Sequence, residues 1–165
     1  MVKKYAVILI IVLLAGIFVS GCRKSVGDRI AENVLEDMTD ADVDISGDGK
    51  NVTIETEEGS FSAGEDIHWP GESLGDLPKP DATIIGVVDN GEQGCSAAFK
   101  EMSKADAEQY VESIKALGYT GNVMNMSDDE SIFYMGSTED GAIATFTYTI
   151  ETEEGLIAYA PASGE

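Results

Sequence analysis

Short runs in which apolar residues alternate with polar ones, or follow one another directly, predict a series of β-strands along this chain. The clearest is a hairpin in which residues 52–56 lead into a turn at Glu57-Glu58-Gly59 and the chain returns through Phe61 and Ala63. A second turn, Asp89-Asn90-Gly91, is of the kind that joins neighbouring antiparallel strands. Further strands are expected near residues 84–88, 95–99, 119–126, 132–135, 143–150 and 156–159.

Two stretches have the apolar spacing of an amphipathic helix. Ser103 is suited to cap a helix that runs to about Leu117, and Gly118 is suited to end it. A shorter helix is expected from Asp28 to Met38. Since the strands do not alternate with helices, we expect an α+β fold, a mainly antiparallel sheet with one main helix packed on one face plus the short N-terminal helix. The apolar residues of that short helix are Ile30, Val34, Leu35 and Met38.

The segment from residue 64 to residue 81 is expected to be an ordered loop. It holds three of the four prolines but also Trp69, and an exposed tryptophan in a linker would leave a large apolar surface in water. We therefore expect Trp69 to fold back onto the core and, with His68, to form a candidate binding loop. His68 has carboxylates nearby, so it could form an acid–base pair with one of them or half of a metal site. The alternative is that its imidazole only makes local hydrogen bonds within the loop. These carboxylates are Glu65, Asp66 and Glu72.

The start of the chain has the pattern of a secretory signal peptide, with two lysines, an apolar stretch from Tyr5 to Val19 and small residues at its end. An uncleaved N-terminal membrane helix is the alternative, although the stretch is shorter than the roughly 20 apolar residues that a span needs. The run Val19-Ser20-Gly21-Cys22 resembles the lipobox of bacterial and some archaeal lipoproteins. That resemblance implies cleavage between Gly21 and Cys22 and a diacylglyceryl group on Cys22. It also implies anchoring at the extracytoplasmic face of the cell membrane.

The expected organisation has four parts: a signal peptide at 1–21, an anchor segment at 22–49, an α+β domain at 50–160 and a frayed tail at 161–165. The anchor segment comprises the lipidated cysteine, a tether, the short helix and an acidic turn. Removal of the first 21 of the 165 residues would leave 144, which suits one domain or two small ones. Lipidation of Cys22 would leave Cys95 without a disulfide partner, so we expect Cys95 to be a buried, small apolar residue.

The charge balance narrows the class of partner. The chain has 31 acidic and 10 basic residues, a net charge of −21, and loss of the two lysines with the signal peptide would make it −23. Such a chain lacks the basic surface that nucleic acid requires. Cationic or divalent-metal partners become plausible, and a solvated acidic surface is the simpler interpretation.

The best match to a metal-binding motif begins at Asp44, where the chain reads D-I-S-G-D-G-K-N-V-T-I-E. Side-chain oxygens stand at positions 1, 3, 5 and 12 of an EF-hand loop, glycine at position 6, and a backbone-carbonyl ligand is expected at position 7. A serine at position 3 and Asn51 at position 8 depart from the usual loop, and a plain Gly-Asp turn is the alternative. Apart from calcium, no cofactor is expected. The candidate ligands are Asp44, Ser46, Asp48, Lys50 and Glu55.

Other candidate chemistry rests on less. Met124 and Met126 would share one face of a strand, where thioethers could bind Cu(I) or simply fill the core. The sequence has no glycine-rich phosphate loop, no CxxC pair and no nucleophile–base constellation. Hydrolase chemistry therefore rests only on the many carboxylates.

Past the lipobox, four features follow one another: the hairpin at 51–61, Trp69-Pro70, the run Leu77-Pro78-Lys79-Pro80, and a helix that carries Tyr110 and ends at Gly118-Tyr119. In this order they resemble a group of uncharacterised small lipoproteins, chiefly of Gram-positive bacteria. The resemblance implies a family of unknown function and adds no site residue beyond the lipobox cysteine. The sequence thus predicts a lipid-anchored, non-enzymatic domain that binds an envelope protein or peptide. Cation binding and envelope hydrolysis are the alternatives.

Overall fold

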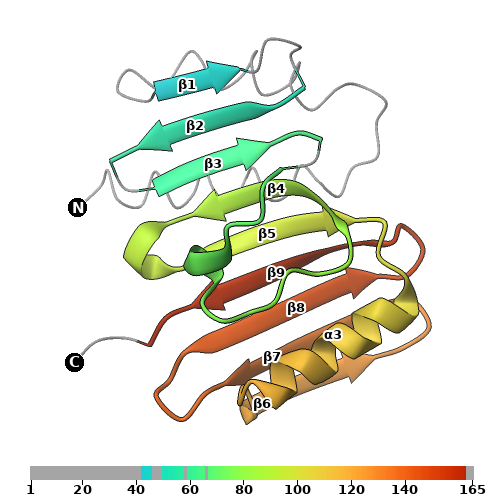
Figure 1. Cartoon of the computed structure of the whole chain (residues 1–165). Coiled ribbons are helices and arrows are strands. Elements are labelled where there is room, and N and C mark those ends of the chain that lie inside the picture. Colours follow the sequence, from blue (N-terminus) through green and yellow to red (C-terminus); the bar gives the residue numbers. More distant parts are fainter. Residues whose placement is uncertain (1–41, 46–49, 58, 66, 163–165) are drawn as a thin grey trace.

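Nine strands lie side by side in one sheet, and every neighbouring pair is antiparallel (Figure 1). The computed structural model describes residues 42–45, 50–57, 59–65 and 67–162. The strand order is β1-β2-β3-β4-β5-β9-β8-β7-β6, so β1 and β6 are the two edges of the sheet. The strands are β1 (Asp42–Ile45), β2 (Val52–Thr56), β3 (Gly59–Ala63), β4 (Thr83–Asp89), β5 (Cys95–Lys100), β6 (Gly121–Ser127), β7 (Ser131–Ser137), β8 (Ile143–Thr149) and β9 (Glu154–Ala160). The other described elements are the α-helix α3 (Lys104–Ala116) and two short 3-10 helices, η2 (Gly71–Leu74) and η3 (Gly91–Gln93).

A period of two explains why the C-terminal strands bury one face. In β8, Phe146 and Tyr148 are buried, while the threonines between them point to the other side of the sheet. Strand pairing extends this pattern, because Tyr134 of β7 and Ile157 of β9 both lie opposite Phe146. All four side chains belong to one buried cluster. This face is therefore the core face of the C-terminal strands.

The helix α3 covers that core face. Its first turn is capped by Ser103, whose hydroxyl oxygen accepts a hydrogen bond from the backbone N–H of Asp106 at 3.2 Å. Gly118 follows the helix with a φ of 94°, a left-handed conformation that glycine adopts without steric cost. The predicted helix from Ser103 to Leu117 is confirmed. Its buried side chains recur at helical spacing and are Ala107, Tyr110, Val111 and Ile114.

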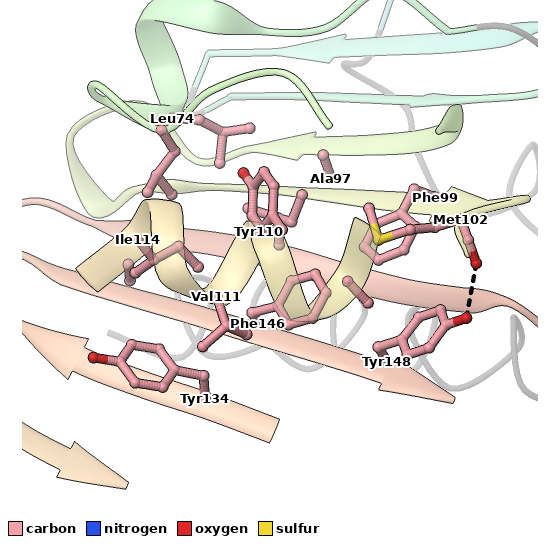
Figure 2. Close-up of a cluster of buried hydrophobic side chains, with 14 of the residues drawn as sticks. Leu74, Ala97, Phe99, Met102, Tyr110, Val111, Ile114, Tyr134, Phe146 and Tyr148 are labelled. Atoms are coloured by element: carbon pink, nitrogen blue, oxygen red, sulfur yellow. Dashed lines mark hydrogen bonds between the residues drawn. The ribbon is translucent and has the colours of Figure 1, made fainter. Parts of the chain in front are cut away.

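Aromatic rings fill the space between α3 and the sheet (Figure 2). The ring centroid of Phe146 lies 5.8 Å from that of Phe99 and 5.3 Å from that of Tyr110. The hydroxyl of Tyr148 donates a hydrogen bond to the carbonyl oxygen of Met102 at 2.7 Å, drawn as the dashed line in Figure 2. Because the buried hydroxyl has an acceptor, the tyrosine can be buried at little cost.

At its N-terminal end the sheet buries the opposite face. Phe61 of β3 lies opposite Val88 of β4, while the adjacent Val87 belongs to the cluster beneath α3. Successive residues of a strand point to opposite faces, so Phe61 points away from α3. On the α3 side, β2 and β3 carry polar residues instead, and the hydroxyl oxygens of Thr53 and Ser62 lie 3.1 Å apart. We call the buried side chains that point away from α3 the second apolar face; they are Val52, Ile54, Phe61 and Ala63.

The expected α+β class is wrong, because the described chain is mainly β, with nine strands and a single α-helix. The short helix expected from Asp28 to Met38 lies outside the described residues. The acidic run at 39–49, expected to be a turn, contains β1. This strand pairs with β2, although it lies before residue 50, where the domain was expected to begin. Two apolar residues among acidic ones give too short an alternation to indicate a strand, and β1 forms because β2 offers it an edge.

Candidate functional site

The Trp-Pro loop lies on the α3 side of the sheet. Between β3 and β4 the chain passes in front of β5 and β9 (Figure 1), and Leu74 and Leu77 are buried in the cluster beneath α3. The half-buried Trp69 packs against the same cluster, which confirms that it folds back onto the core. Its indole ring is therefore used for packing. Of the predicted pair only His68 is exposed.

The carboxylate of Glu65, one of the groups expected near His68, has other partners. Its Oε2 lies 3.1 Å from Nζ of Lys50, and its backbone N–H donates to Oδ1 of Asn51 at 2.9 Å. These contacts fix the start of the loop against the residues that precede β2. Within the described ranges, no group of three or more His, Cys, Asp or Glu side chains is arranged to hold a metal ion.

The predicted calcium motif spans two strands of a hairpin. Asp44 lies on β1 opposite Thr53, and Glu55 lies on β2 opposite Asp42, so its first and last positions stand on adjacent antiparallel strands. An EF-hand instead wraps its twelve residues around the ion between two helices. Lys50 directs its ammonium group to Glu65. Of the expected ligands, Ser46 and Asp48 lie outside the described residues.

We expect millimolar calcium to leave the melting temperature of the protein unchanged, because strand pairing holds Asp44 and Glu55 in a ladder rather than around one ion. A ligand that binds only the folded state raises its stability, so a calorimetric scan with and without calcium measures the site directly. Magnesium at the same concentration is the control for ionic strength. A rise of several degrees that disappears in Asp44→Asn would contradict this expectation and establish a calcium site.

Cys95 is free and buried on β5, as the sequence predicts. Burial, together with the smaller effect of the negative charge of Asp89, raises the pKa of its thiol to about 12. The thiol is therefore protonated at neutral pH and shielded from solvent. A nucleophilic cysteine needs the opposite environment, so Cys95 has a packing role.

The lipobox and Cys22 lie outside the described residues, and anchoring through Cys22 stays a prediction. In the part of the chain that the structure describes, no helix has the length and apolar character to cross a membrane.

The most unusual described surface is the edge strand β6. Val123 and Met124 are each 48% exposed and Met126 is 58% exposed, although all three are large apolar side chains. We call these three residues of β6 the edge patch; Met124 and Met126 share one face of the strand. The other exposed large apolar side chains lie nearby in the sequence or the sheet: Leu117 follows α3, and Ile143 begins β8.

Hydrogen bonds to the rest of the sheet fix the backbone at the start of β6, just before the edge patch. Tyr119, just before β6, is buried, and its carbonyl oxygen accepts a hydrogen bond from the hydroxyl of Tyr134 at 2.6 Å. Asn122 has a φ of 48° at a register shift between Gly121 and Met124, and its amide donates to the hydroxyl of Ser137 at 3.2 Å. A bulge of this kind is one of the devices that interrupt pairing at a sheet edge. From Met124 onward, β6 pairs regularly with β7, and no described strand pairs with its outer side.

Two rows of uncharged side chains continue from Met124 and Met126 across the same face of the sheet. In the pairing register, one row runs from Met124 through β7, β8 and β9, and a second row runs from Met126 beside it. Charged residues gather instead at one end of β6, in the turn Asp128-Asp129-Glu130. Hydrogen bonds from the backbone N–H groups of Glu130 and Ser131 lower the pKa of Asp128, so this carboxylate stays ionised. The first row contains Met135, Thr145 and Ala158, and the second contains Phe133, Thr147 and Leu156.

Met124 and Met126 share one face of β6, as the sequence predicts, but their side chains, expected to bind copper or to fill the core, are exposed. The informative signal was composition, because residues 121–127 contain no charge in a chain whose net charge is −21. Strand order could not be inferred locally, so the exposure of β6 was not predictable.

No protein-family model matches this chain, and no curated protein or solved structure matches it either. Functional assignment therefore rests on the residues themselves. The resemblance of the lipobox and of the Trp-Pro segment to small lipoproteins stays an expectation from the sequence.

Proposed function

We propose that this protein is a lipid-anchored, extracytoplasmic binding protein that takes up an extended peptide segment as an added strand along β6. The observation that carries the proposal is the edge patch, three exposed apolar side chains on an uncharged edge strand. Natural proteins usually protect such edges with lysine, proline or a covering element. An edge left apolar is suited to strand addition, in which backbone hydrogen bonds supply affinity and alternate side chains supply specificity.

The charge around the edge patch defines the chemistry of the segment. Residues 121–127 are uncharged, whereas Asp128, Asp129 and Glu130 stand together at the end of the strand. The segment should therefore carry apolar side chains at alternate positions, to cover Met124 and Met126. It should also carry lysine or arginine at the end that meets the three carboxylates.

Selection of linear ten-residue peptides against the protein tests this binding mode. We expect the selected peptides to share apolar alternation with a basic end. Met126→Lys should weaken their binding about tenfold or more, since it places a charge in the contact. Gln109→Lys, an equal charge change at an exposed position of α3, is the matched control and should bind as the unaltered protein does. Peptides that bind both variants equally would contradict an edge site at β6.

Anchoring is tested separately through Cys22. With Cys22→Ala we expect no acyl label to enter the protein, and the domain to be released or to keep its signal peptide uncut. Radiolabelled or clickable fatty acid measures the modification, and membrane fractionation measures the location. Label that persists in Cys22→Ala would overturn the lipid anchor without affecting the binding proposal.

A further inference from the structure

The two most exposed sulfur-containing side chains among the described residues belong to the edge patch. Met126 is 58% exposed and Met124 is 48% exposed. The other described methionines are better protected, since Met135 is half-buried on β7 and Met102 is 1% exposed in the core cluster. A small reactive molecule dissolved in water therefore reaches the thioethers of β6 first.

A thioether in contact with water is oxidised by a peroxide without activation by the protein. A lone pair of the sulfur attacks one oxygen of hydrogen peroxide, the O–O bond breaks, and that oxygen stays on the sulfur as a sulfoxide. The sulfur loses two electrons, and the peroxide is reduced to water. Hydrogen peroxide is uncharged, so the net charge of −21 does not repel it. The thiol of Cys95 does not compete, because it is buried and protonated, whereas peroxide reacts with thiolates.

We propose that Met124 and Met126 are oxidation sites, and that their conversion to sulfoxides weakens the binding of a peptide strand along β6. The effect on binding rests on the proposed function, whereas the assignment of the two sites rests on their exposure. A sulfoxide is polar, so an edge that carries two of them no longer offers the apolar surface that the peptide covers. Covering the new oxygens removes their water, and the apolar side chains expected in the peptide have no hydrogen-bond donor to replace it.

The neighbours of the two methionines make the change in polarity large. Met124 lies opposite Met135 and Met126 lies opposite Phe133, so each thioether adjoins an apolar side chain of β7 on the same face. The rows that continue across β8 and β9 contain no charged side chain to pair with a sulfoxide oxygen. Leucine at both positions would give similar apolar cover without a sulfur, and it therefore supplies the matched control.

Treatment of the full-length protein with hydrogen peroxide, followed by peptide mapping in a mass spectrometer, tests the two sites. We expect Met126 and Met124 each to gain one oxygen at least about tenfold faster than Met102, with Met135 between them. A thermal melt of the treated protein checks that the fold is intact. Oxidation of Met102 as fast as the two methionines of β6 would overturn the assignment, because exposure would then not decide which methionines react.

Binding of a selected ten-residue peptide without methionine or cysteine tests the consequence. Catalase removes the peroxide before the peptide is added, so only the protein is oxidised. The Kd should rise about tenfold or more after oxidation. The two classes of methionine sulfoxide reductase, one for each sulfoxide epimer, should together restore it. The double variant Met124→Leu, Met126→Leu keeps every other sulfur of the chain; it should bind as the unaltered protein does and should be insensitive to peroxide.

The possible failures are distinguishable. An unchanged Kd after complete oxidation of Met124 and Met126 would overturn the effect on binding and leave the peptide site itself intact. An equal loss of binding in the leucine variant would also overturn it, because the effect would then come from another sulfur. If the unoxidised protein bound no selected peptide, the proposed function and its control by oxidation would both fall, while the mapping would still decide which methionines are oxidised.

Discussion

Replacing Phe146 by alanine is expected to lower the free energy of unfolding by about 3–5 kcal/mol. The ring is fully buried on β8, where it stacks against Phe99 of β5 and packs at a tilt against Tyr110 of α3. Removing it leaves a cavity between helix and sheet that neither element can close without losing its other contacts. Small domains are stable by roughly 5–15 kcal/mol in total, so this loss is a large part of the whole.

Urea unfolding, followed through the fluorescence of Trp69 and through circular dichroism, measures the effect of Phe146→Ala. The matched control is Thr147→Ala, the next residue along β8, which is half-buried on the opposite face. It should cost less than about 1 kcal/mol. Similar losses in the two variants would mean that the core does not lie between α3 and the sheet.

Gly155→Ala is expected to destabilise the protein by about 3 kcal/mol, or to prevent folding, because the site has no room for a methyl group. A Cβ at Gly155 would lie 2.1 Å from the backbone oxygen of Thr147 and 2.4 Å from Cζ of Phe99. The oxygen belongs to the neighbouring strand β8 and the ring is fully buried in the core, so neither can withdraw. The cause is steric, since Gly155 is not among the glycines with a positive φ.

The control for Gly155→Ala is Gly71→Ala, where the nearest atom, Cδ1 of Trp69, would be at an ordinary 3.8 Å. That change should leave stability unchanged or raise it slightly, because alanine restricts the unfolded chain more than glycine does. Thermal melts should separate the two variants by roughly 10 °C. A normal melt for Gly155→Ala would show that β8 and β9 are not packed as closely as described.

Local patterns predicted the elements whose causes are local. The helix α3 was predictable because Ser103 caps it and Gly118 ends it within one short segment. The strands β5, β7 and β8 were predictable because buried positions recur at every second residue within each of them. β1 was not predictable, because it depends on a partner strand that begins seven residues after it ends. The mainly-β class was therefore not predictable either.

The face that each strand buries was harder to predict than the strand itself. Alternation identifies the apolar side of β2 and β3, but it does not say whether that side points toward α3 or away from it. The same limit applies to the candidate site. Trp69 was the most conspicuous candidate by residue type, yet it packs against the core cluster. Met126 is of a residue type usually found in the core, yet it lies exposed on an edge strand.

The place of β9 in the sheet sets the order of events during biosynthesis. β9, the last of the described strands along the chain, lies between β5 and β8, and it joins the ribbon β1–β5 to the ribbon β6–β8. Until β9 has left the ribosome or an export channel, the facing edges of β5 and β8 are unpaired and the core is incomplete. Completion of the sheet must wait until β9 has emerged, and the pairing of β9 with β5, which lies far from it in the sequence, is intrinsically slow. The chain with β9 still unpaired is thus the form that most needs protection from aggregation, and truncation before β9 would make that exposure permanent.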